Sequence, residues 1–454
     1  MSQIDELRKK METITLEMIN LLKLRTDVAK EIGEIKKDMG ITVTNETRES
    51  ELREKIIAEC NTLNLDESIG TKFLNFLLNE SVKVQSKNTQ THLTIFLKAK
   101  EMEQKGKKII HLEVGEPDFP PPESVKKSLS EVYEKGFGKY GPAEGLLEFR
   151  QTVAKFCNER FHGKINSDNI LIVPGARFGV FLSISTLLNP GDEMIVIEPA
   201  WPAYRQCAIN AGVKIRAIKT TLESNWEPTI EQINSAINSN TKMIVLNYPN
   251  NPTGKILPEK LQDEIMNIVK KHDLFILSDE IYSNYSNKTW KSILSYDYKK
   301  AIITQSFSKS HSMTGYRIGY TISTPEIINK LTKLQALCLT NVSEPIQYIA
   351  LNSINEDVSA NYTLIHERLN VLIENCKKLN LEFTVPDGAM YVFAKIKNSE
   401  INASNLAHKL LEHGLAVAPG EAFGDYGEFF RISACIEKES IIEGMNILNR
   451  VLEN

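Results

Sequence analysis

Asn247-Tyr-Pro-Asn-Asn-Pro-Thr-Gly254 reveals the architecture of this chain, because a short apolar run leads directly into this polar, proline-containing turn. Four more apolar runs each end a few residues before a polar, aromatic or glycine residue. In an α/β fold, ligands bind just beyond the carboxyl ends of the strands. The sequence therefore predicts five strands that direct the following residues to one rim. The runs and residues are 170–173 before Gly175, 194–197 before Trp201, 243–246 before Asn251, 274–277 before Asp279, and 301–303 before Ser306.

The polar side chains at this rim match the needs of a pyridoxal phosphate (PLP) enzyme. A lysine can form a Schiff base, and an aspartate can keep the pyridine nitrogen protonated, so that the ring withdraws electrons. An asparagine and a tyrosine can hydrogen-bond the phenolic oxygen of the ring, while a serine and an arginine can hold the phosphate. No single one of these residues is specific, so the prediction rests on their coincidence. In the order of these roles they are Lys309, Asp279, Asn251, Tyr282, Ser306 and Arg317.

Residues from about 95 to the end resemble a fold-type I aminotransferase of class I/II. Two further motifs carry the resemblance, Val114-Gly-Glu-Pro-Asp-Phe119 and Pro174-Gly-Ala-Arg177. In the family, the glycine of the first motif, here Gly115, lies near the substrate. The second motif opens a helix after a strand, where backbone N–H groups can bind a phosphate.

The same resemblance assigns roles to residues outside these motifs. It implies that Trp201 stacks on the cofactor and that a tyrosine from the partner subunit, Tyr140, reaches the phosphate. Arg431, in Phe430-Arg-Ile-Ser433, would pair with the substrate α-carboxylate. Sites shared in this way imply at least a homodimer. Further cofactor contacts are expected from Gly175, Ala176 and Arg177.

Arg177 has two interpretations. Some relatives carry a lysine at this position that recognises the distal carboxylate of acidic substrates, whereas relatives that favour neutral aromatic acids tend to have an uncharged residue. Prephenate carries such a second carboxylate. The alternative is that Arg177 supports the cofactor phosphate or a neighbouring acid.

The first 90 residues differ in composition from the rest of the chain. All 17 prolines lie at Pro117 or later, and only four glycines precede Gly115. This composition predicts a nearly uninterrupted helical module, joined to the rest at about 86–92. The expected domains are an all-α domain at 1–90 and an α/β PLP-transferase domain at 91–454, with a large, mostly parallel part at about 135–350 and a small α+β part from 95–134 and 351–454.

Apolar spacing predicts three helices in this module, at about 4–39, 45–60 and 66–86. The first would be roughly 50 Å long, which a small monomeric domain cannot cover, so it needs a partner chain. Arg25 interrupts an apolar stripe that repeats every seven residues. A buried arginine is costly unless an anion pairs with it. The apolar members of the stripe are Ile4, Met11, Met18, Ile32 and Met39.

Other polar residues are in phase with Arg25. Lys36 follows it by eleven residues, about three helical turns, and therefore faces the same way. Arg8 lies about 100° off that face and can more easily serve the pocket of a partner chain. The third helix adds Ser81 and Gln85 at a spacing of four residues. Such an interhelical cavity suits a small dianion with hydroxyl and ether oxygens.

This pattern resembles the all-helical (AroQ-type) chorismate mutase family over residues 4 to about 88. By that resemblance Arg8 from the partner chain and Arg25 would bind the carboxylates of chorismate. Lys36 and Gln85 would hydrogen-bond the ether oxygen, where negative charge grows as the C–O bond breaks. The remaining carboxylate and hydroxyl contacts would come from Arg48, Glu49 and Ser81.

The implied reaction is a unimolecular rearrangement that needs no nucleophile. Catalysis would come from holding the compact conformer and from electrostatic stabilisation of the polarised transition state. Asn45 stands where the family often has an aspartate, and its amide can still bond a hydroxyl.

Two other classes of protein are alternatives to a chorismate mutase-like front module. A helical dimerisation or regulatory arm would explain Arg25 as a polar residue that sets the helix register, but it needs neither Lys36 nor the Ser81/Gln85 pair. A PLP-binding transcription regulator would carry a DNA-binding front module. Residues 1–90 hold 14 basic and 16 acidic residues, a net charge of -2, which is the wrong sign for binding phosphates.

Other sites and locations are not supported by the sequence. The six cysteines include no Cys-x-x-Cys pair, which favours a reduced, cytoplasmic compartment. His408 and His413 are isolated, and no metal site is predicted. The start of the chain does not resemble a signal peptide, and no apolar run approaches the about 20 residues of a membrane span.

The sequence thus predicts a bifunctional enzyme of aromatic amino acid biosynthesis. The front module would convert chorismate to prephenate, and the body would transfer an amino group by PLP chemistry. Lys309 would first hold the cofactor and then move the proton at the substrate Cα. The amino acceptor stays open among prephenate, phenylpyruvate, 4-hydroxyphenylpyruvate and oxaloacetate. The alternative is an aspartate or aromatic aminotransferase whose front helices only dimerise or regulate.

Overall fold

The computed structural model describes residues 3–38, 46–85, 92–397 and 401–453. These residues form two compact units, Met1–Thr89 and Gln90–Asn454. Most of the predicted joint, together with Met39 and Asn45, lies outside the described residues.

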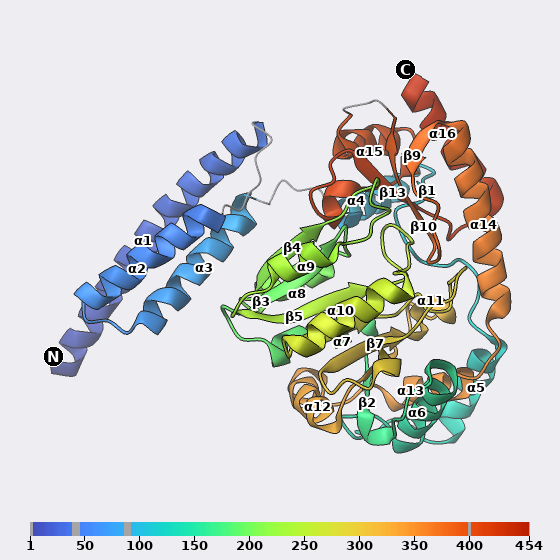
Figure 1. The fold of residues 1–454 in the computed structure, drawn as a ribbon, viewed down its shortest axis with the longest axis horizontal. Helices are drawn as coiled ribbons and strands as arrows, with labels where there is room; N and C mark the ends of the chain where they lie inside the picture. The colour runs from blue at the N-terminus through green and yellow to red at the C-terminus, as the bar shows by residue number, and fades with distance from the viewer. Residues whose placement is uncertain (1–2, 39–45, 86–91, 398–400, 454) are drawn as a thin grey trace. The chain divides into compact units, whose positions relative to one another are not determined.

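The N-terminal unit consists of three helices, drawn in blue in Figure 1: α1 (Gln3–Asp38), α2 (Glu46–Thr62) and α3 (Glu67–Gln85). Helix α3 contacts both α1 and α2. Gly70 allows the close approach of α2 and α3, since a Cβ added there would lie 2.2 Å from the Sγ of Cys60. The side chains buried in this unit include Ala29, Cys60 and Leu74.

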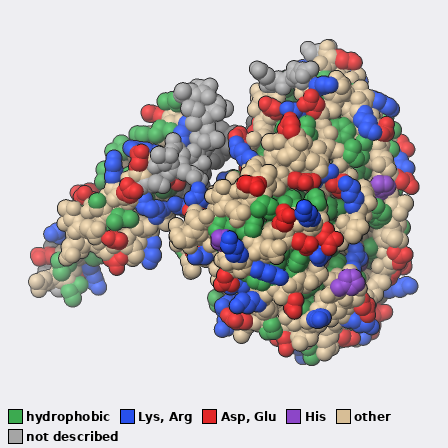
Figure 2. All heavy atoms as spheres, viewed as in Figure 1, with side chains coloured by type: hydrophobic (Ala, Val, Ile, Leu, Met, Phe, Trp, Pro, Cys, Tyr) green, Lys and Arg blue, Asp and Glu red, His purple; other side chains and the backbone are tan. Residues whose placement is uncertain are grey.

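The apolar stripe of α1 is not buried within one chain. Ile4 is 60% exposed and Met11 is 69% exposed, and Met18 and Ile32 are exposed as well. Green hydrophobic side chains are accordingly visible on the surface of this unit in Figure 2. The expected buried stripe therefore does not hold for these four apolar residues in the single chain, whereas Arg25 itself is partly buried.

The C-terminal unit is built around a seven-stranded sheet in the order β2-β8-β7-β6-β5-β3-β4 (Figure 1). Only β8 runs antiparallel to its neighbours, β2 and β7; the other described pairs are parallel. The predicted mostly parallel sheet is confirmed. Its strands are β2 (Ile170–Val173), β3 (Glu193–Glu198), β4 (Lys214–Lys219), β5 (Thr241–Asn247), β6 (Phe275–Asp279), β7 (Ala301–Ser306) and β8 (Gly319–Ile322).

Both faces of this sheet are covered by helices, which explains the continuous apolar runs. Successive residues of β2 point to opposite faces: Ile170 and Ile172 join one hydrophobic core, and Leu171 and Val173 join another. The helices of this part are α6 (Leu147–Phe161), α7 (Ala176–Leu187), α8 (Ala203–Asn210), α9 (Ile230–Ala236), α10 (Glu259–Lys271), α11 (Phe307–Ser310), α12 (Pro325–Leu339) and α13 (Glu344–Ser353).

A smaller part packs around a four-stranded antiparallel sheet, β12-β13-β10-β9, and a parallel pair, β1 with β11. Its strands are β1 (Ile110–His111), β9 (Leu381–Phe383), β10 (Tyr391–Ile396), β11 (Leu415–Ala416), β12 (Ala418–Pro419) and β13 (Phe429–Ser433). Its helices are α4 (His92–Gln104), α14 (Ser359–Lys378), α15 (Ala403–Glu412) and α16 (Lys438–Glu453).

Helix α5 (Glu123–Glu134) lies with the large sheet. It contacts α13, and its Val125 belongs to a core that also contains Ile170 of β2. The sequence predicts that residues 95–134 belong to the small part. For α5 the structure differs, because the apolar face of this helix is buried against the large part.

Candidate active sites

A cavity of about 570 Å³ lies beyond the carboxyl ends of β5, β6 and β7, at the rim that the sequence predicts. Most of the predicted aminotransferase residues line it, although they come from widely separated parts of the chain. Those that line it are Gly115, Ala176, Arg177, Trp201, Asn251, Asp279, Tyr282, Lys309, Arg317 and Arg431.

Lys309 lies on the short helix α11, which follows β7. Its Nζ donates to the carbonyl oxygen of Gly115 at 2.6 Å. Burial lowers the pKa of Lys309. A lower pKa makes the neutral amine, which is the nucleophilic form, more available.

Ser306 caps α11 rather than lining the cavity. Its hydroxyl accepts from the backbone N–H of Ser308 and donates to the carbonyl of Ile318 at 2.9 Å. Ser308 lines the cavity instead. The predicted phosphate contact of Ser306 stays a prediction.

Asp279 ends β6 and is buried. The hydroxyl of Tyr204 donates to its Oδ2 at 2.7 Å, and Asn247 donates to its backbone carbonyl at 2.9 Å. Burial raises the pKa of Asp279 to about 6, against the opposing effect of the Tyr204 hydrogen bond. A cation beside this carboxylate would stabilise its charged form, and a protonated pyridine nitrogen is such a cation.

Two arginines, Arg317 and Arg177, add positive charge to the cavity lining. Arg317 donates to the carbonyls of Thr314 at 2.8 Å and Pro174 at 3.2 Å. Burial lowers its pKa, and the nearby Arg177 lowers it further. Gly175 precedes α7 with φ +86°, and a Cβ there would lie 2.6 Å from a guanidinium nitrogen of Arg317. Two arginine side chains and the backbone N–H groups at the N-terminus of α7 could together bind a phosphate group.

Arg431 of β13 provides a further cationic group at the cavity. Its Nη1 donates to the Oδ1 of Asn251 at 2.7 Å, and its Nη2 donates to the carbonyl of Glu113. The guanidinium lies 4.3 Å from the ring centre of Tyr391. Its Nε is buried and has no hydrogen-bond partner among the described residues. Such a held, incompletely paired guanidinium fits a carboxylate ligand.

Two tyrosines of this site were not predicted. The hydroxyl of Tyr204 donates to Asp279. Because Tyr204 follows Trp201 by three residues, about one helical turn, its position in the sequence could have predicted that it lies near the cofactor site. The hydroxyl of Tyr391 is hydrogen-bonded to the hydroxyl of Tyr282 at 2.8 Å, although the two residues are 109 positions apart. A Cβ on Gly115 would lie 1.8 Å from its hydroxyl oxygen, which explains the glycine there. No local pattern identifies Tyr391.

Tyr140 does not line the cavity and is 87% exposed in the single chain. Its predicted contact is with the site of a partner chain. That contact remains a prediction.

In the N-terminal unit, the structure brings together two of the predicted residues. The Nη1 of Arg25 donates to the carbonyl of Leu77 at 2.8 Å and to the Oγ of Ser81 at 2.5 Å, which joins α1 to α3. Burial lowers the pKa of Arg25. Lys36 is partly buried on α1, and the side chain of Gln85 lies outside the described residues.

The remaining predicted residues of this unit lie nearer the surface. Arg8 is 3.7 Å from Asp5, and Arg48 is 2.8 Å from Glu51; both arginine side chains are largely exposed. Glu49 is partly buried. Within one chain, Arg8 is therefore engaged by its own helix rather than by the Arg25–Ser81 pair.

The described residues contain no group of three or more His, Cys, Asp or Glu side chains arranged to hold a metal ion. None of the described helices is long and apolar enough to cross a membrane.

Comparison with known families agrees with this geometry. Residues 107–448 match the family "Aminotransferase class I and II". The chain belongs to this family. Residues 7–86 match "Chorismate mutase type II", so a chorismate mutase domain precedes the aminotransferase domain. The predicted two-family composition is confirmed, and the aminotransferase family uses PLP.

Individual relatives cover the aminotransferase domain nearly completely. An aspartate aminotransferase of Thermotoga maritima is 33% identical over 362 residues, which are 79% of this chain and 95% of that protein. Aromatic-amino-acid aminotransferase 2 of Thermococcus litoralis is 30% identical over 361 residues, 76% of this chain and 92% of that protein. A crystal structure of the Thermotoga maritima aspartate aminotransferase superposes with a TM-score of 0.77 at 32% identity, covering 80% of this chain and 97% of that one.

Proposed function

We propose that this class I/II aminotransferase domain binds PLP and transfers amino groups to an aromatic or prephenate-type 2-oxo acid, and that the front domain rearranges chorismate to prephenate. The main support is that Lys309 lines one cavity together with the buried Asp279, Arg317 and Arg431. When bound, PLP supplies a ring that withdraws electrons from the substrate Cα.

Each residue of the cavity has a defined task in this proposal. Asp279, oriented by Tyr204, would keep the proton on the pyridine nitrogen. Arg317 and the backbone at the start of α7 would hold the phosphate, aided by Ser306. Tyr282 and Asn251 would bind the phenolic oxygen, and Trp201 would contact the ring. Lys309 would hold the cofactor and then move the proton at the substrate Cα.

Arg431 is assigned the substrate α-carboxylate. Asn251 and the carbonyl of Glu113 already hold its two terminal nitrogens, so the guanidinium is oriented before substrate binds. Preorganisation of this kind reduces the entropy cost of binding. Gly115 leaves room for the substrate beside Tyr391.

The mutase site is assigned to the surroundings of the Arg25–Ser81 hydrogen bond. Arg25 would bind a carboxylate of chorismate, Lys36 and Gln85 would stabilise the ether oxygen, and Arg48 and Glu49 would complete the site. The site needs Arg8 from a second copy of the chain. The exposed apolar face of α1 supports a homodimer, and the six free cysteines agree with a cytoplasmic location.

Mixing two inactive variants tests the shared mutase site. Arg8→Ala and Arg25→Ala should each lack mutase activity as pure proteins. If Arg8 acts across the dimer, about half of the exchanged dimers are hybrid with one intact site of two, so about a quarter of wild-type activity should return.

Mutase activity is measured before and after subunit exchange in mild denaturant. Mixing either variant with itself is the control. No recovery despite proven subunit exchange would contradict the assignment of Arg8 to the partner's site.

Arg177 is the proposed determinant of acidic substrates. Its guanidinium lies 4.9 Å from the ring centre of Trp201, at the cavity wall. Arg177→Gln should lower kcat/KM for prephenate, glutamate or aspartate on the order of tenfold to a hundredfold, because a charged hydrogen bond to the distal carboxylate is lost.

Phenylpyruvate, which has no distal carboxylate, is the matched control and should be nearly unaffected. Steady-state kinetics with both substrate classes measure the difference. Equal losses for acidic and neutral substrates would indicate a cofactor defect and contradict the proposed role.

A further inference from the structure

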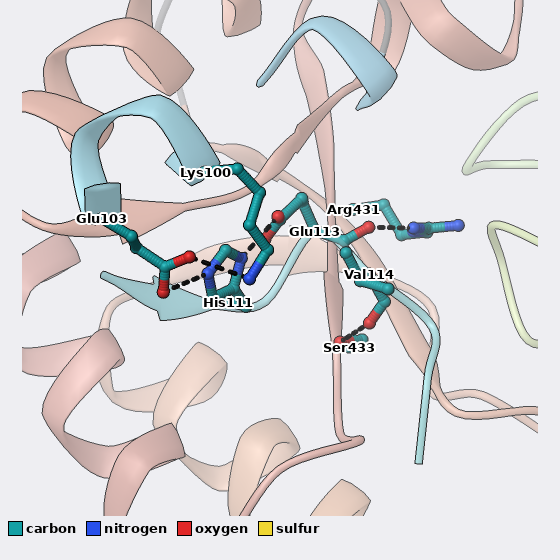
Figure 3. Close-up of polar contacts among 7 residues, drawn as sticks. All are labelled: Lys100, Glu103, His111, Glu113, Val114, Arg431 and Ser433. Carbon is teal, nitrogen blue, oxygen red and sulfur yellow. Dashed lines mark hydrogen bonds and ion pairs between the residues drawn. The ribbon is translucent and has the colours of Figure 1, made fainter. Parts of the chain in front are cut away.

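A histidine lies between two carboxylates next to the aminotransferase site (Figure 3). His111 of β1 pairs through Nδ1 with the Oε1 of Glu113 at 2.8 Å, and through Nε2 with the Oε1 of Glu103 of α4 at 3.1 Å. Lys100, one turn before Glu103, donates to its other oxygen at 2.8 Å. Both ring nitrogens can donate only when the imidazole is protonated, so this arrangement is complete only with a cationic His111.

Glu113 depends on this histidine. Its side chain is 1% exposed, and its Oε2 is buried without a hydrogen-bond partner among the described residues. Among those residues, His111 is the partner that the structure gives to its carboxylate. A buried carboxylate is costly unless a cation or several donors compensate its charge. Deprotonation of His111 would therefore destabilise the charged carboxylate of Glu113 in its buried position.

The backbone that carries Glu113 holds two working side chains of the site. The carbonyl of Glu113 accepts from Nη2 of Arg431, and the carbonyl of Gly115 accepts from Nζ of Lys309 at 2.6 Å. Between them, the carbonyl of Val114 accepts from Ser433 at 2.7 Å. A shift of this segment would thus move the acceptor that orients Arg431.

We propose that His111, held as a cation between Glu103 and Glu113, is a positioning residue that fixes the 113–115 backbone and thereby the guanidinium of Arg431. The proposal rests on the assignment of the substrate α-carboxylate to Arg431. His111 itself does not line the cavity, and it acts only through Glu113.

The surroundings of His111 favour its protonated form. The charged groups that face its ring are Glu113 on its own segment and Glu103 on α4, with Lys100 behind Glu103. The adjacent strand β11 offers only Leu415 and Ala416. The hydrogen bond with Glu113 raises the pKa of His111 above 6.5, against the opposing effect of burial. The positioned state is therefore present at low pH and is lost as the pH rises through the folded-state pKa.

Binding of a carboxylate to the holoenzyme tests this inference. Maleate, which has no titrating amine, is titrated against the visible absorbance of the bound cofactor between about pH 7 and 9, above the range in which its own carboxyl groups titrate. At the low end of this range, His111→Gln should raise the Kd on the order of five- to twentyfold, and the Kd should lose one pH-dependent step that the wild type shows. The surface variant His413→Gln is the matched control and should behave as wild type.

A second variant keeps the histidine. Glu103→Gln removes one of the two carboxylates, so the pH at which maleate binding weakens should fall. This variant decides the matter if His111→Gln fails to fold. An unchanged pH profile in Glu103→Gln, or a wild-type Kd at every pH in a folded His111→Gln, overturns the role of His111.

Arg431→Gln separates this inference from the assignment on which it rests. If Arg431→Gln weakens maleate binding while His111→Gln does not, only the role of His111 fails. If Arg431→Gln binds maleate as wild type does, the assignment of the α-carboxylate to Arg431 fails, and the role of His111 fails with it.

Discussion

Lys309→Ala should abolish transamination, with kcat lower by at least about 10⁴-fold, because one side chain supplies both the covalent anchor and the proton transfer at Cα. Burial lowers the pKa of Lys309, and no other described lysine lines the cavity. Steady-state transamination and the visible spectrum of the protein-bound cofactor measure the two functions separately.

Lys300→Ala is the matched control. Lys300 directly precedes β7, does not line the cavity, and donates to the Oδ2 of Asp273 at 2.6 Å. It should retain both activity and spectrum. A Lys309→Ala protein with the wild-type spectrum and near-wild-type turnover would remove Lys309 from its role. Mutase activity should persist in both variants, because Lys300 and Lys309 belong to the other compact unit.

Arg25→Ala should abolish mutase activity, with kcat/KM lower on the order of 10³-fold, because a preorganised cation at the reacting dianion is lost. Transamination and cofactor loading should persist. Arg25→Met should be equally inactive, yet the helical unit should remain at least as stable as in the wild type, since a partly desolvated cation gives way to an apolar side chain. In Arg25→Met the carbonyl of Leu77 still accepts a hydrogen bond, because the Ser81 hydroxyl donates to it.

Chorismate disappearance and thermal unfolding of the full chain measure the two effects. Arg53→Met is the matched control, because Arg53 also links two helices, through the Oδ1 of Asn75 at 2.8 Å, but has no proposed role in the mutase reaction. It should keep near-wild-type mutase kinetics. Unchanged mutase kinetics in both Arg25 variants would instead support front helices that only dimerise or regulate.

Local sequence patterns were sufficient for the residues that directly follow strands. Asn251, Asp279 and Lys309 come within a few residues of β5, β6 and β7, and all three line the cavity. The reason is geometric: parallel neighbouring strands end at the same edge, so residues just after them converge whatever the connections do. The three front helices were predicted within two residues of their ends for the same kind of reason, since the absence of proline and the apolar spacing act locally.

Contacts between distant segments could not be predicted in this way. Arg431 and Glu113 are 318 residues apart, and Tyr391 and Tyr282 are 109 apart, yet each pair is hydrogen-bonded. The order of the large sheet, with β8 between β2 and β7, is likewise absent from local periodicity. Periodicity reports which face of an element is buried, but it does not report which element covers that face.

The chain's local chemistry is thus enough to place a lysine, an aspartate and an asparagine at one rim, and to place Arg25 on a long helix. Tertiary packing alone decides that Tyr204 orients Asp279, that Ser306 caps a helix while Ser308 meets the cavity, and that His111 compensates a buried Glu113. The physical reason is that hydrogen bonding and desolvation depend on neighbours within a few ångströms, and chain folding brings those neighbours from positions that the sequence separates by tens or hundreds of residues.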